Sequence, residues 1–501
     1  AAMWRTEAWV QLNVLIPTAI GNFFEYVPVV SALAIVGHLQ GREFLDAMAL
    51  GRAFFNATMM APGFGIVSAL RTLCPQAVGA NKPRLCAVYV QQAIFLGVLG
   101  SFVFASMQFF SAECLLLTGQ EPRVAELSGV YTRWLIPSYY FIVCMTSLQR
   151  AMQAHNLNYQ NLLICTVGGL TAPPTQWFFC AQAGFGYIGA AMASAVTNGL
   201  FVVLQVPYLI SEGLSYLLRP QMQQVVATKS MKHFLSLAIP GFAACVIEWW
   251  VFEIVMFLSG LLENPEVTVA ASAVATTTQA VYLMAWIGFL VAASVRVGQA
   301  IGAGDVKAAK LSAKVALGLT AFAAAWTGSI LFIFSDQVAA FYSNDEEVKA
   351  LGSQVVKLMA PLVAIDAINN TVGGIMSGLG KQRESAMAQV IGYYAFGMPL
   401  GIYLTFSETG LGGSQLGVFG LWGGIGVSML ASLSIQILFL LRFDWREALK
   451  DARTRLGERK HAVEGGKGTV EPGTAEDLAA LLAEEAPDDA VEDARLGKST
   501  L

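Results

Sequence analysis

Twelve long apolar segments, joined by short charged loops, set the limits on how this chain can fold. Each is close to or above the roughly 20 residues that a helix needs to cross the hydrocarbon core of a bilayer. A chain with 55% hydrophobic and 13% charged residues has too much apolar surface to bury in a soluble fold. The predicted spans are 9–37, 47–70, 86–110, 128–148, 159–182, 187–211, 233–262, 268–295, 309–334, 350–376, 386–405 and 418–441. We therefore expect an all-α membrane protein with 12 transmembrane helices.

The charges of the connecting loops test this count independently. Cytoplasmic loops retain Lys and Arg, whereas translocated loops lose them. With a cytoplasmic N-terminus, the inner loops contain Arg71, Lys82, Arg84, Arg150, Arg219, Lys229, Lys232, Arg296, Lys307, Lys310, Lys381 and Arg383. The outer loops carry mainly Asp and Glu. This pattern predicts an even number of spans with both termini in the cytoplasm. We expect the membrane to be the plasma membrane or a vacuolar or other organelle membrane.

The two halves of the chain repeat one another. Pro17 and Glu25 recur as Pro240 and Glu248, in each case 223 positions later, and the QAVGA motif at 76–80 recurs as QAIGA at the same spacing. Six spans per half is an even number, so both halves enter the membrane from the same side. We expect two six-helix lobes related by a pseudo-twofold axis along the membrane normal, with a substrate path between them.

The repeat also predicts where the chain divides. We expect an N-terminal lobe at 1–211, a cytoplasmic linker at 212–232 and a C-terminal lobe at 233–443. Residues 444–501 begin with mixed charge and continue rich in Asp, Glu, Ala and Gly. Such a composition cannot build an apolar core, so we expect a disordered acidic cytoplasmic tail.

Four acidic residues lie deep within predicted spans: Glu25, Glu248, Glu253 and Asp366. An ionised carboxylate near the bilayer centre costs at least a few kcal/mol, so each is a functional candidate by default. A carboxyl group buried without a counter-ion can hold a proton and release it when a cation approaches. Glu248 and Glu253 are five positions apart and should face different sides of one helix, so Glu248 is assigned to the cavity first. The alternative is a structural acid bonded to a neighbouring hydroxyl or backbone group.

Aromatic residues near these acids could contact an organic cation through their ring faces. The candidates are Trp249, Trp250, Tyr282, Trp286, Tyr393 and Tyr394. For any single one of these aromatic residues, helix packing is favoured over contact with a cation. The sequence has no Walker motif for ATP, no clustered histidines or cysteines for a metal or cofactor, and no continuous basic patch for nucleic acid. No nucleophile constellation indicates an enzyme.

Several motifs resemble the eukaryotic branch of the multidrug and toxic compound extrusion (MATE) family. They are Glu248-Trp249-Trp250 with Phe252-Glu253, then Ala292-Ala293-Ser294-Val295-Arg296-Val297-Gly298 with Gly302-Ala303-Gly304-Asp305, Leu148-Gln149-Arg150 and Gly392-Tyr393-Tyr394. The resemblance covers about residues 8–443. It implies that the acids of family helices 7 and 10 correspond to Glu248, Glu253 and Asp366. It also implies a substrate cleft lined by Trp249, Tyr282, Thr277, Gln279, Asn370 and Tyr394. Two departures are Thr277, where animal members have a glutamate, and Glu25, where relatives often have a neutral residue.

These observations predict a monomeric antiporter that exports organic cations and other xenobiotics in exchange for protons. Glu248 and Asp366, with Glu253 and Glu25, would couple the two ions while the lobes rock around a central cleft. One alternative is a sodium-coupled exporter, or an exporter of organic anions or metabolites, on the same fold. A different class would be a lipid flippase or a passive channel. Its transport would be indifferent to both ion gradients.

Overall fold

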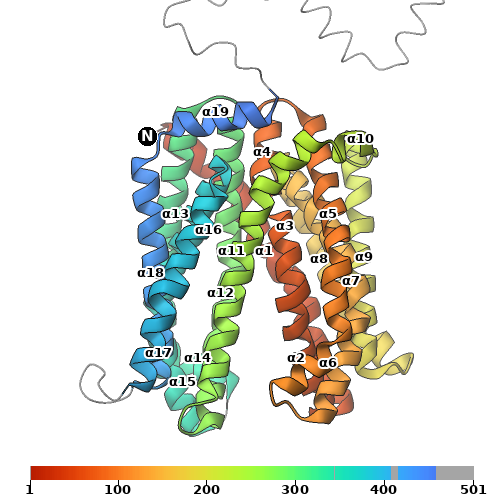
Figure 1. Ribbon diagram of the computed structural model, residues 1–501, viewed down its shortest axis with the longest axis vertical. Helices are drawn as coiled ribbons and strands as arrows, with labels where there is room; N and C mark the ends of the chain where they lie inside the picture. The colour runs from red at the N-terminus through yellow and green to blue at the C-terminus, as the bar shows by residue number, and fades with distance from the viewer. Residues whose placement is uncertain (1, 344, 408–415, 458–501) are drawn as a thin grey trace, which may run out of the picture. The chain divides into compact units, whose positions relative to one another are not determined.

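A computed structural model describes residues 2–343, 345–407 and 416–457, which contain helices and no strands (Figure 1). The first half comprises α1 (Ala2–Gln40), α2 (Arg42–Phe55), the π-helical turn η1 (Asn56–Met60), α3 (Ala61–Val67), α4 (Leu70–Gly79), α5 (Pro83–Phe109), α6 (Ser111–Leu117), α7 (Pro122–Ala154), α8 (Asn158–Trp177), the π-helical turn η2 (Phe178–Gln182) and α9 (Gly186–Ser211). The short elements η3 (Ser215–Leu217) and α10 (Met222–Val225) form the connection to the second half. The second half comprises α11 (Thr228–Ser259), α12 (Pro265–Gly302), α13 (Val306–Ile333), α14 (Ser335–Tyr342), α15 (Glu346–Leu379), α16 (Gln382–Val390), the π-helical turn η4 (Ile391–Gly397), α17 (Met398–Phe406), α18 (Val418–Arg442) and α19 (Trp445–Arg455).

Helical structure runs through the twelve predicted spans. Within the described residues, nine helical segments are long and apolar enough to cross a membrane: Ala2–Gln40, Glu43–Gly79, Pro83–Phe109, Gly186–Ser211, Thr228–Met256, Glu266–Gly302, Val306–Ile333, Glu346–Leu379 and Val418–Arg442. The predicted spans at 128–148, 159–182 and 386–405 are helical, but polar residues make them less apolar. The multi-pass all-α architecture is therefore confirmed, whereas the count of twelve spans stays a prediction.

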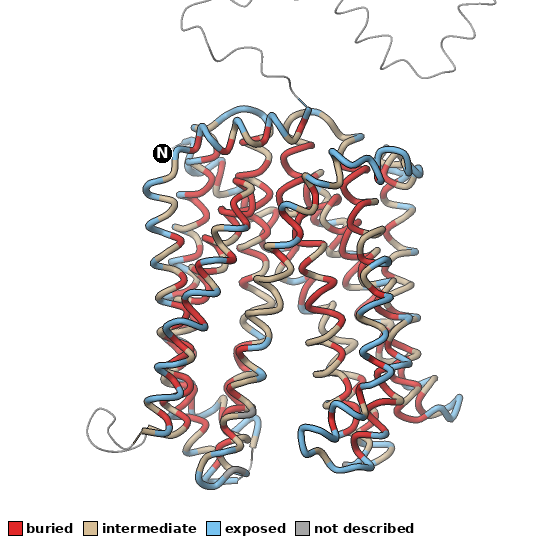
Figure 2. Tube along the Cα trace, viewed as in Figure 1, coloured by how far each residue is buried: buried red, intermediate tan, exposed pale blue. Residues whose placement is uncertain are grey.

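Each half of the chain has its own apolar core. One core includes Met48, Tyr131 and Tyr139, and the other includes Trp286 and Trp422. Figure 2 shows buried residues, in red, running through both groups of helices. The membrane domain thus consists of two lobes, which we call the first lobe and the second lobe.

The first long helix of each half extends into the core of the opposite lobe. Val14 and Leu15 of α1 lie in the second-lobe core, and Leu237 and Ala238 of α11 lie in the first-lobe core. These pairs are separated by the same 223 positions as the sequence repeat. The exchange of helices is therefore symmetric, as the predicted pseudo-twofold relation requires.

The lobes meet at one end of the bundle, which we call the closed end, and their helices diverge toward the other end (Figure 1). At the closed end the Gln76 Nε2 of α4 donates to the Gly378 carbonyl of α15 at 2.9 Å. The Gln299 Nε2 of α12 donates to the Ala154 carbonyl of α7, also at 2.9 Å. Gln76 and Gln299 are repeat partners, and Ala154 and Gly378 are 224 positions apart. The two bonds therefore form one symmetric pair, which we call the glutamine clasps.

Two glycines let the lobes approach closely at this point. A Cβ atom on Gly79 would collide with the backbone of Gln299, and one on Gly302 would collide with the backbone of Gln76. The QAVGA and QAIGA motifs are thus the two halves of one interface. Each motif supplies a glutamine that bonds across to the other lobe. Each also supplies a glycine whose missing side chain leaves room for the backbone of the other motif.

The predicted disorder of the tail is wrong for its first residues. Trp445–Arg455 forms helix α19, which begins where the Asp444 carboxylate accepts a hydrogen bond from the Arg446 backbone N–H at 3.0 Å. Its apolar side buries Trp445, Ala448 and Ala452 against α12, α13 and α15. Sequence reasoning missed this amphipathic helix because charged residues dominate the segment and its apolar face consists of only a few residues. Residues 458–501, the remainder of the predicted tail, lie outside the described residues.

Helix α19 contacts both lobes across the closed end. In the second lobe, the Lys381 Nζ pairs with Asp451 at 3.0 Å and Glu447 at 3.3 Å. Burial alone would lower the pKa of Lys381, but the hydrogen bond and charge of Asp451, with the charges of Glu384 and Glu447, raise it overall. In the first lobe, the Arg455 Nη2 donates to the Gln76 Oε1 at 3.2 Å. The helix therefore reaches one of the glutamine clasps.

Candidate functional site

Asp366 lies on α15 inside the second lobe and is only 3% exposed. The Gln279 Nε2 of α12 donates to its Oδ2 at 2.8 Å, and the Asn370 Nδ2 donates to its Oδ1 at 3.1 Å. Glycine allows these two helices to pack closely, because a Cβ atom on Gly374 of α15 would collide with the Leu290 backbone of α12. Asp366 is thus held by two neutral amides. No cationic side chain pairs with it among the described residues.

Glu248 lies on α11 and is partly buried. Its charge interacts with the carboxylate of Asp366 and with the guanidinium of Arg71, which belongs to α4 in the first lobe. The side chain of Tyr393 is 1% exposed and lies near enough to both carboxylates for their charges to act on its hydroxyl. Within the described residues, the Glu248 carboxylate has no hydrogen-bond partner. The structure therefore groups Glu248, Asp366 and Tyr393 into one acidic site.

The other two predicted acids lie away from this group. Glu253 is exposed and faces a different side of α11, as its five-residue spacing from Glu248 predicts. Glu25 lies on α1 in the first lobe, where its Oε1 accepts hydrogen bonds from the Gln149 Nε2 at 2.6 Å and the Cys165 Sγ at 3.0 Å. Glu25 and Glu248 are repeat partners in sequence, but each belongs to a separate lobe.

The predicted cleft residues fall into two groups. Gln279 and Asn370 are the direct hydrogen-bond donors to Asp366. Trp249 packs instead against Phe64 of α3, with ring centroids 6.1 Å apart, at the core of the first lobe.

Three further cleft candidates lie elsewhere. Tyr282 packs against the second-lobe core, and Thr277 is exposed on α12. The Tyr394 hydroxyl donates to the Ile247 carbonyl at 3.2 Å, which ties η4 to α11 one residue before Glu248. Most of these aromatic residues therefore serve packing in this conformation, as the alternative interpretation of the sequence allowed.

Sequence reasoning missed the role of two arginines. Arg71 and Arg150 were assigned to inner loops, but Arg71 lies within α4 and Arg150 within α7. Arg71 interacts with Glu248, and Arg150 interacts with Glu25 and Arg71. One signal was available for Arg71, since no Gly, Pro, Asn or Asp separates it from residues 66–70, of which only Ser68 is polar. The lack of a helix-breaking residue favours a helix over a loop at Arg71, and in the structure only a two-residue turn, Ser68 and Ala69, precedes α4.

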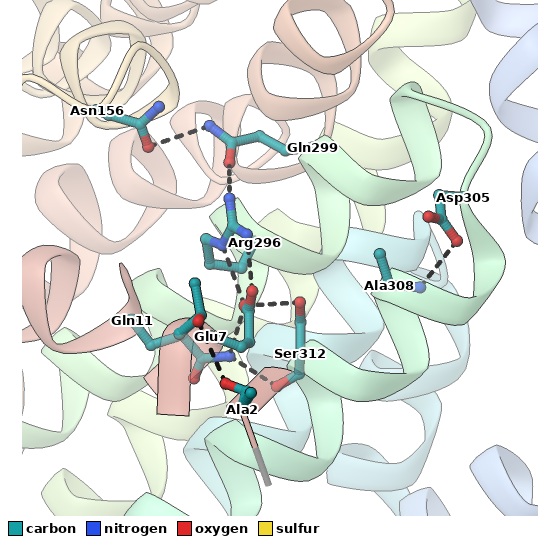
Figure 3. A network of polar contacts seen from close by, with 10 residues as sticks. Ala2, Glu7, Gln11, Asn156, Arg296, Gln299, Asp305, Ala308 and Ser312 are labelled. Atoms are coloured by element: carbon teal, nitrogen blue, oxygen red, sulfur yellow. Dashed lines mark hydrogen bonds and ion pairs between the residues drawn. The ribbon is translucent and has the colours of Figure 1, made fainter. Parts of the chain in front are cut away.

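A second buried acid, Glu7 of α1, belongs to a different kind of network (Figure 3). Its carboxylate accepts hydrogen bonds from Arg296 of α12 at 2.8 and 3.1 Å and from the Ser312 Oγ of α13 at 2.7 Å. The Arg296 Nη1 in turn donates to the Gln299 Oε1 at 3.0 Å. Both Glu7 oxygens are thus satisfied by fixed partners. This network orients a glutamine clasp and is not a candidate binding site.

The two lobes, the symmetric helix exchange and the acidic site within the second lobe define a multi-pass membrane transporter. A family model described as MatE matches residues 17–177 and 240–403, which are the two halves of the repeat. The chain belongs to this family, the multidrug and toxin extrusion transporters.

Individual relatives agree with this assignment. The chain is 30% identical to multidrug and toxin extrusion protein 1 of Xenopus tropicalis, over 90% of this chain and 78% of that protein. It is 28% identical to protein DETOXIFICATION 1 of Arabidopsis thaliana, over 88% of this chain and 91% of that protein. The solved structure of the eukaryotic MATE transporter AtDTX14 superposes with a TM-score of 0.85 at 27% identity, covering 91% of this chain and all of that one.

Proposed function

We propose that this transporter exports organic cations in exchange for protons, with Glu248 and Asp366 as the coupling residues. The observation that carries the proposal is their placement: two interacting carboxyl groups lie within one membrane lobe, and Asp366 has only amide partners among the described residues. Two neighbouring carboxyls cannot both ionise without a large cost. The site therefore favours one proton or one organic cation at a time.

Arg71 links this site to the movement of the lobes. It belongs to the first lobe, whereas Glu248 belongs to the second, so rocking of one lobe against the other changes their separation. In the described conformation Arg71 is the cation that partly compensates Glu248. When the lobes separate at the closed end, Glu248 loses that compensation and gains affinity for a proton or for a cationic substrate. This difference between conformations is what coupled exchange requires.

The remaining predicted residues have subsidiary roles in this proposal. Glu25 provides a second proton-binding carboxyl, in the first lobe, and Glu253 and Thr277 face the path between the lobes. Tyr282, Tyr394 and Trp249 present aromatic rings to the substrate once the lobes move. The names of the relatives, multidrug and toxin extrusion proteins, support drugs and toxins as the substrate class, and the acidic site favours the cationic ones. The closed end, which contains the loops rich in Lys and Arg, faces the cytoplasm in this proposal.

The direct test is uptake of a fluorescent organic cation such as ethidium into proteoliposomes with an imposed pH gradient. Exchange of one proton for one monovalent cation moves no net charge, so the drive is about 1.4 kcal/mol per tenfold proton ratio. We expect Glu248→Gln and Asp366→Asn to reduce gradient-driven uptake to the rate of protein-free liposomes. Glu263→Gln, which removes an exposed acid from the α11–α12 loop, is the matched control and should transport normally. Normal uptake by Glu248→Gln would remove that residue from the mechanism.

The same assay separates the competing functions. Replacing sodium by potassium at fixed pH leaves uptake unchanged in a proton-coupled exporter and abolishes it in a sodium-coupled one. A flippase or passive channel would carry the dye at a rate that depends on neither gradient.

A further inference from the structure

A cavity of about 740 Å³ opens at the closed end between the start of α11, the short helix α10 and α16. It is separate from the acidic site, since no residue of that site lines it. Two basic residues, Lys232 of α11 and Arg383 of α16, lie at its rim, and Leu235 and Ile239 form part of its apolar wall. Its size falls within the range of sites that hold a small organic ligand.

The basic residues at the rim have no acidic partners. Lys232 and Arg383 are both exposed, and neither forms an ion pair or a side-chain hydrogen bond among the described residues. Lys229 lies three positions before Lys232 on α11, so the two ammonium groups are neighbours on the helix and add to the positive potential. The nearest acid along the chain, Glu384, interacts with Lys381 instead. The rim is therefore electropositive, and it disfavours the organic cations that the transporter is proposed to carry.

The wall below this rim is apolar and uncovered. Ile239 is 62% exposed and Val226 is 53% exposed, so both present aliphatic surface that no other part of the described chain covers. Lys232 and Ile239 are seven positions apart on α11, so they share one face and are separated by about 10 Å along the helix axis. The cavity therefore combines a charged upper part with an apolar lower part on one side of the same helix.

We propose that this cavity binds one anionic phospholipid. Its phosphodiester group would lie between Lys232 and Arg383, and an acyl chain would run along Leu235 and Ile239. Basic pockets between transmembrane helices at the cytoplasmic side recognise anionic head groups through this combination of charge and apolar surface. The bound lipid bridges α11, which carries Glu248, and α16, and it covers apolar surface that the protein leaves open. This inference does not depend on the identity of the transported substrate.

The test is native mass spectrometry of the purified full-length protein with added phosphatidylglycerol or phosphatidylcholine. We expect the protein to retain phosphatidylglycerol in preference to phosphatidylcholine. Each basic residue near a lipid surface strengthens binding about fivefold, so Lys232→Gln with Arg383→Gln should weaken retention about thirtyfold. The matched control is Arg84→Gln with Lys307→Gln, which removes the same charge from two exposed positions outside the cavity and should leave retention unchanged.

Three results would overturn the proposal. Equal retention by the cavity variant and the control variant would show that the lipid binds elsewhere. Equal retention of both lipids by the unmodified protein would show that the cavity does not select an anion. Displacement of phosphatidylglycerol by a synthetic peptide of residues 458–501 would show that the acidic end of the chain is the occupant. Because all four substituted residues are exposed, loss of folding does not confuse these outcomes.

Discussion

The hydrogen bonds of the glutamine clasps determine how much free energy the two motifs contribute to the closed conformation. Gln76 donates to the Gly378 carbonyl and accepts from Arg455, and Gln299 donates to the Ala154 carbonyl and accepts from Arg296. A neutral hydrogen bond contributes about 1 kcal/mol and one to a charged group about 1.5 to 3 kcal/mol. Gln76→Leu removes a neutral and a charged bond that both cross between the lobes, and should destabilise the closed end by about 3 kcal/mol, or roughly 100-fold in the equilibrium between conformations. The Arg296 bond of Gln299 lies within α12, so Gln299→Leu removes only the cross-lobe bonds to the Ala154 carbonyl and the Asn156 Oδ1 and should cost about 2 kcal/mol, or roughly 30-fold.

The two substitutions together should invert the population. Gln76 and Gln299 bond to different partners, so their effects should be close to additive, at about 5 kcal/mol. That value is close to the roughly 5.5 kcal/mol that changes a 99:1 population to 1:99. We therefore expect either single variant to populate measurably the conformation in which the lobes separate at this end. The double variant should populate that conformation predominantly.

Distances between spin labels measure this equilibrium. Arg84 and Lys307 are exposed at the closed end, one in each lobe, and they are 223 positions apart. Labels on cysteines at these positions, with the exposed Cys114 replaced by serine, report the separation of the lobes. The distance distribution should shift to longer values in Gln76→Leu and Gln299→Leu.

The matched control is Gln205→Leu. Gln205 is as buried as Gln76 and donates to the Met145 carbonyl at 3.2 Å, but both Gln205 and Met145 belong to the first lobe. This variant should lower thermal stability without changing the distance between the labels. If the clasp variants keep the wild-type distance distribution, or if Gln205→Leu changes it equally, then the clasps do not determine the conformational equilibrium.

Three further predictions follow from neighbouring contacts. Arg71→Gln removes the cation that compensates Glu248, so we expect the pH dependence of ethidium uptake to shift; an unchanged pH profile would show that the two groups are not coupled. Glu7→Gln breaks the ion pair with Arg296 and should lower the free energy of unfolding by about 2 kcal/mol, seen as a lower melting temperature. Adding Arg296→Gln to this variant should cost less than Arg296→Gln alone; if the two losses of stability are fully additive, the residues do not form a direct pair. Trp445→Ala removes a buried ring and should weaken α19 docking by about 3 kcal/mol, seen as faster backbone hydrogen exchange in α19; wild-type exchange rates would refute the docking.

The sequence by itself determined the architecture of the membrane domain. Long apolar runs specify membrane helices because the bilayer core offers no water to the polar backbone, and a helix satisfies its N–H and C=O groups within the segment. A repeat at a constant 223 positions then specifies two related lobes, because equal sequences in equal surroundings adopt equal folds. The acids Glu248 and Asp366 could also be identified in advance, since the cost of burying a carboxyl group does not depend on which helix carries it.

Only the tertiary structure decided which groups face these acids. Arg71 reaches Glu248 from the other lobe, and Gln149 reaches Glu25 from α7, because helices distant in the chain pack together. Their sequence spacing gives no indication of these contacts. The same reason applies to α19, whose Arg455 reaches Gln76 across 379 positions. The local sequence around Arg455 shows mixed charge, and only the surface presented by both lobes turns that segment into a docked helix.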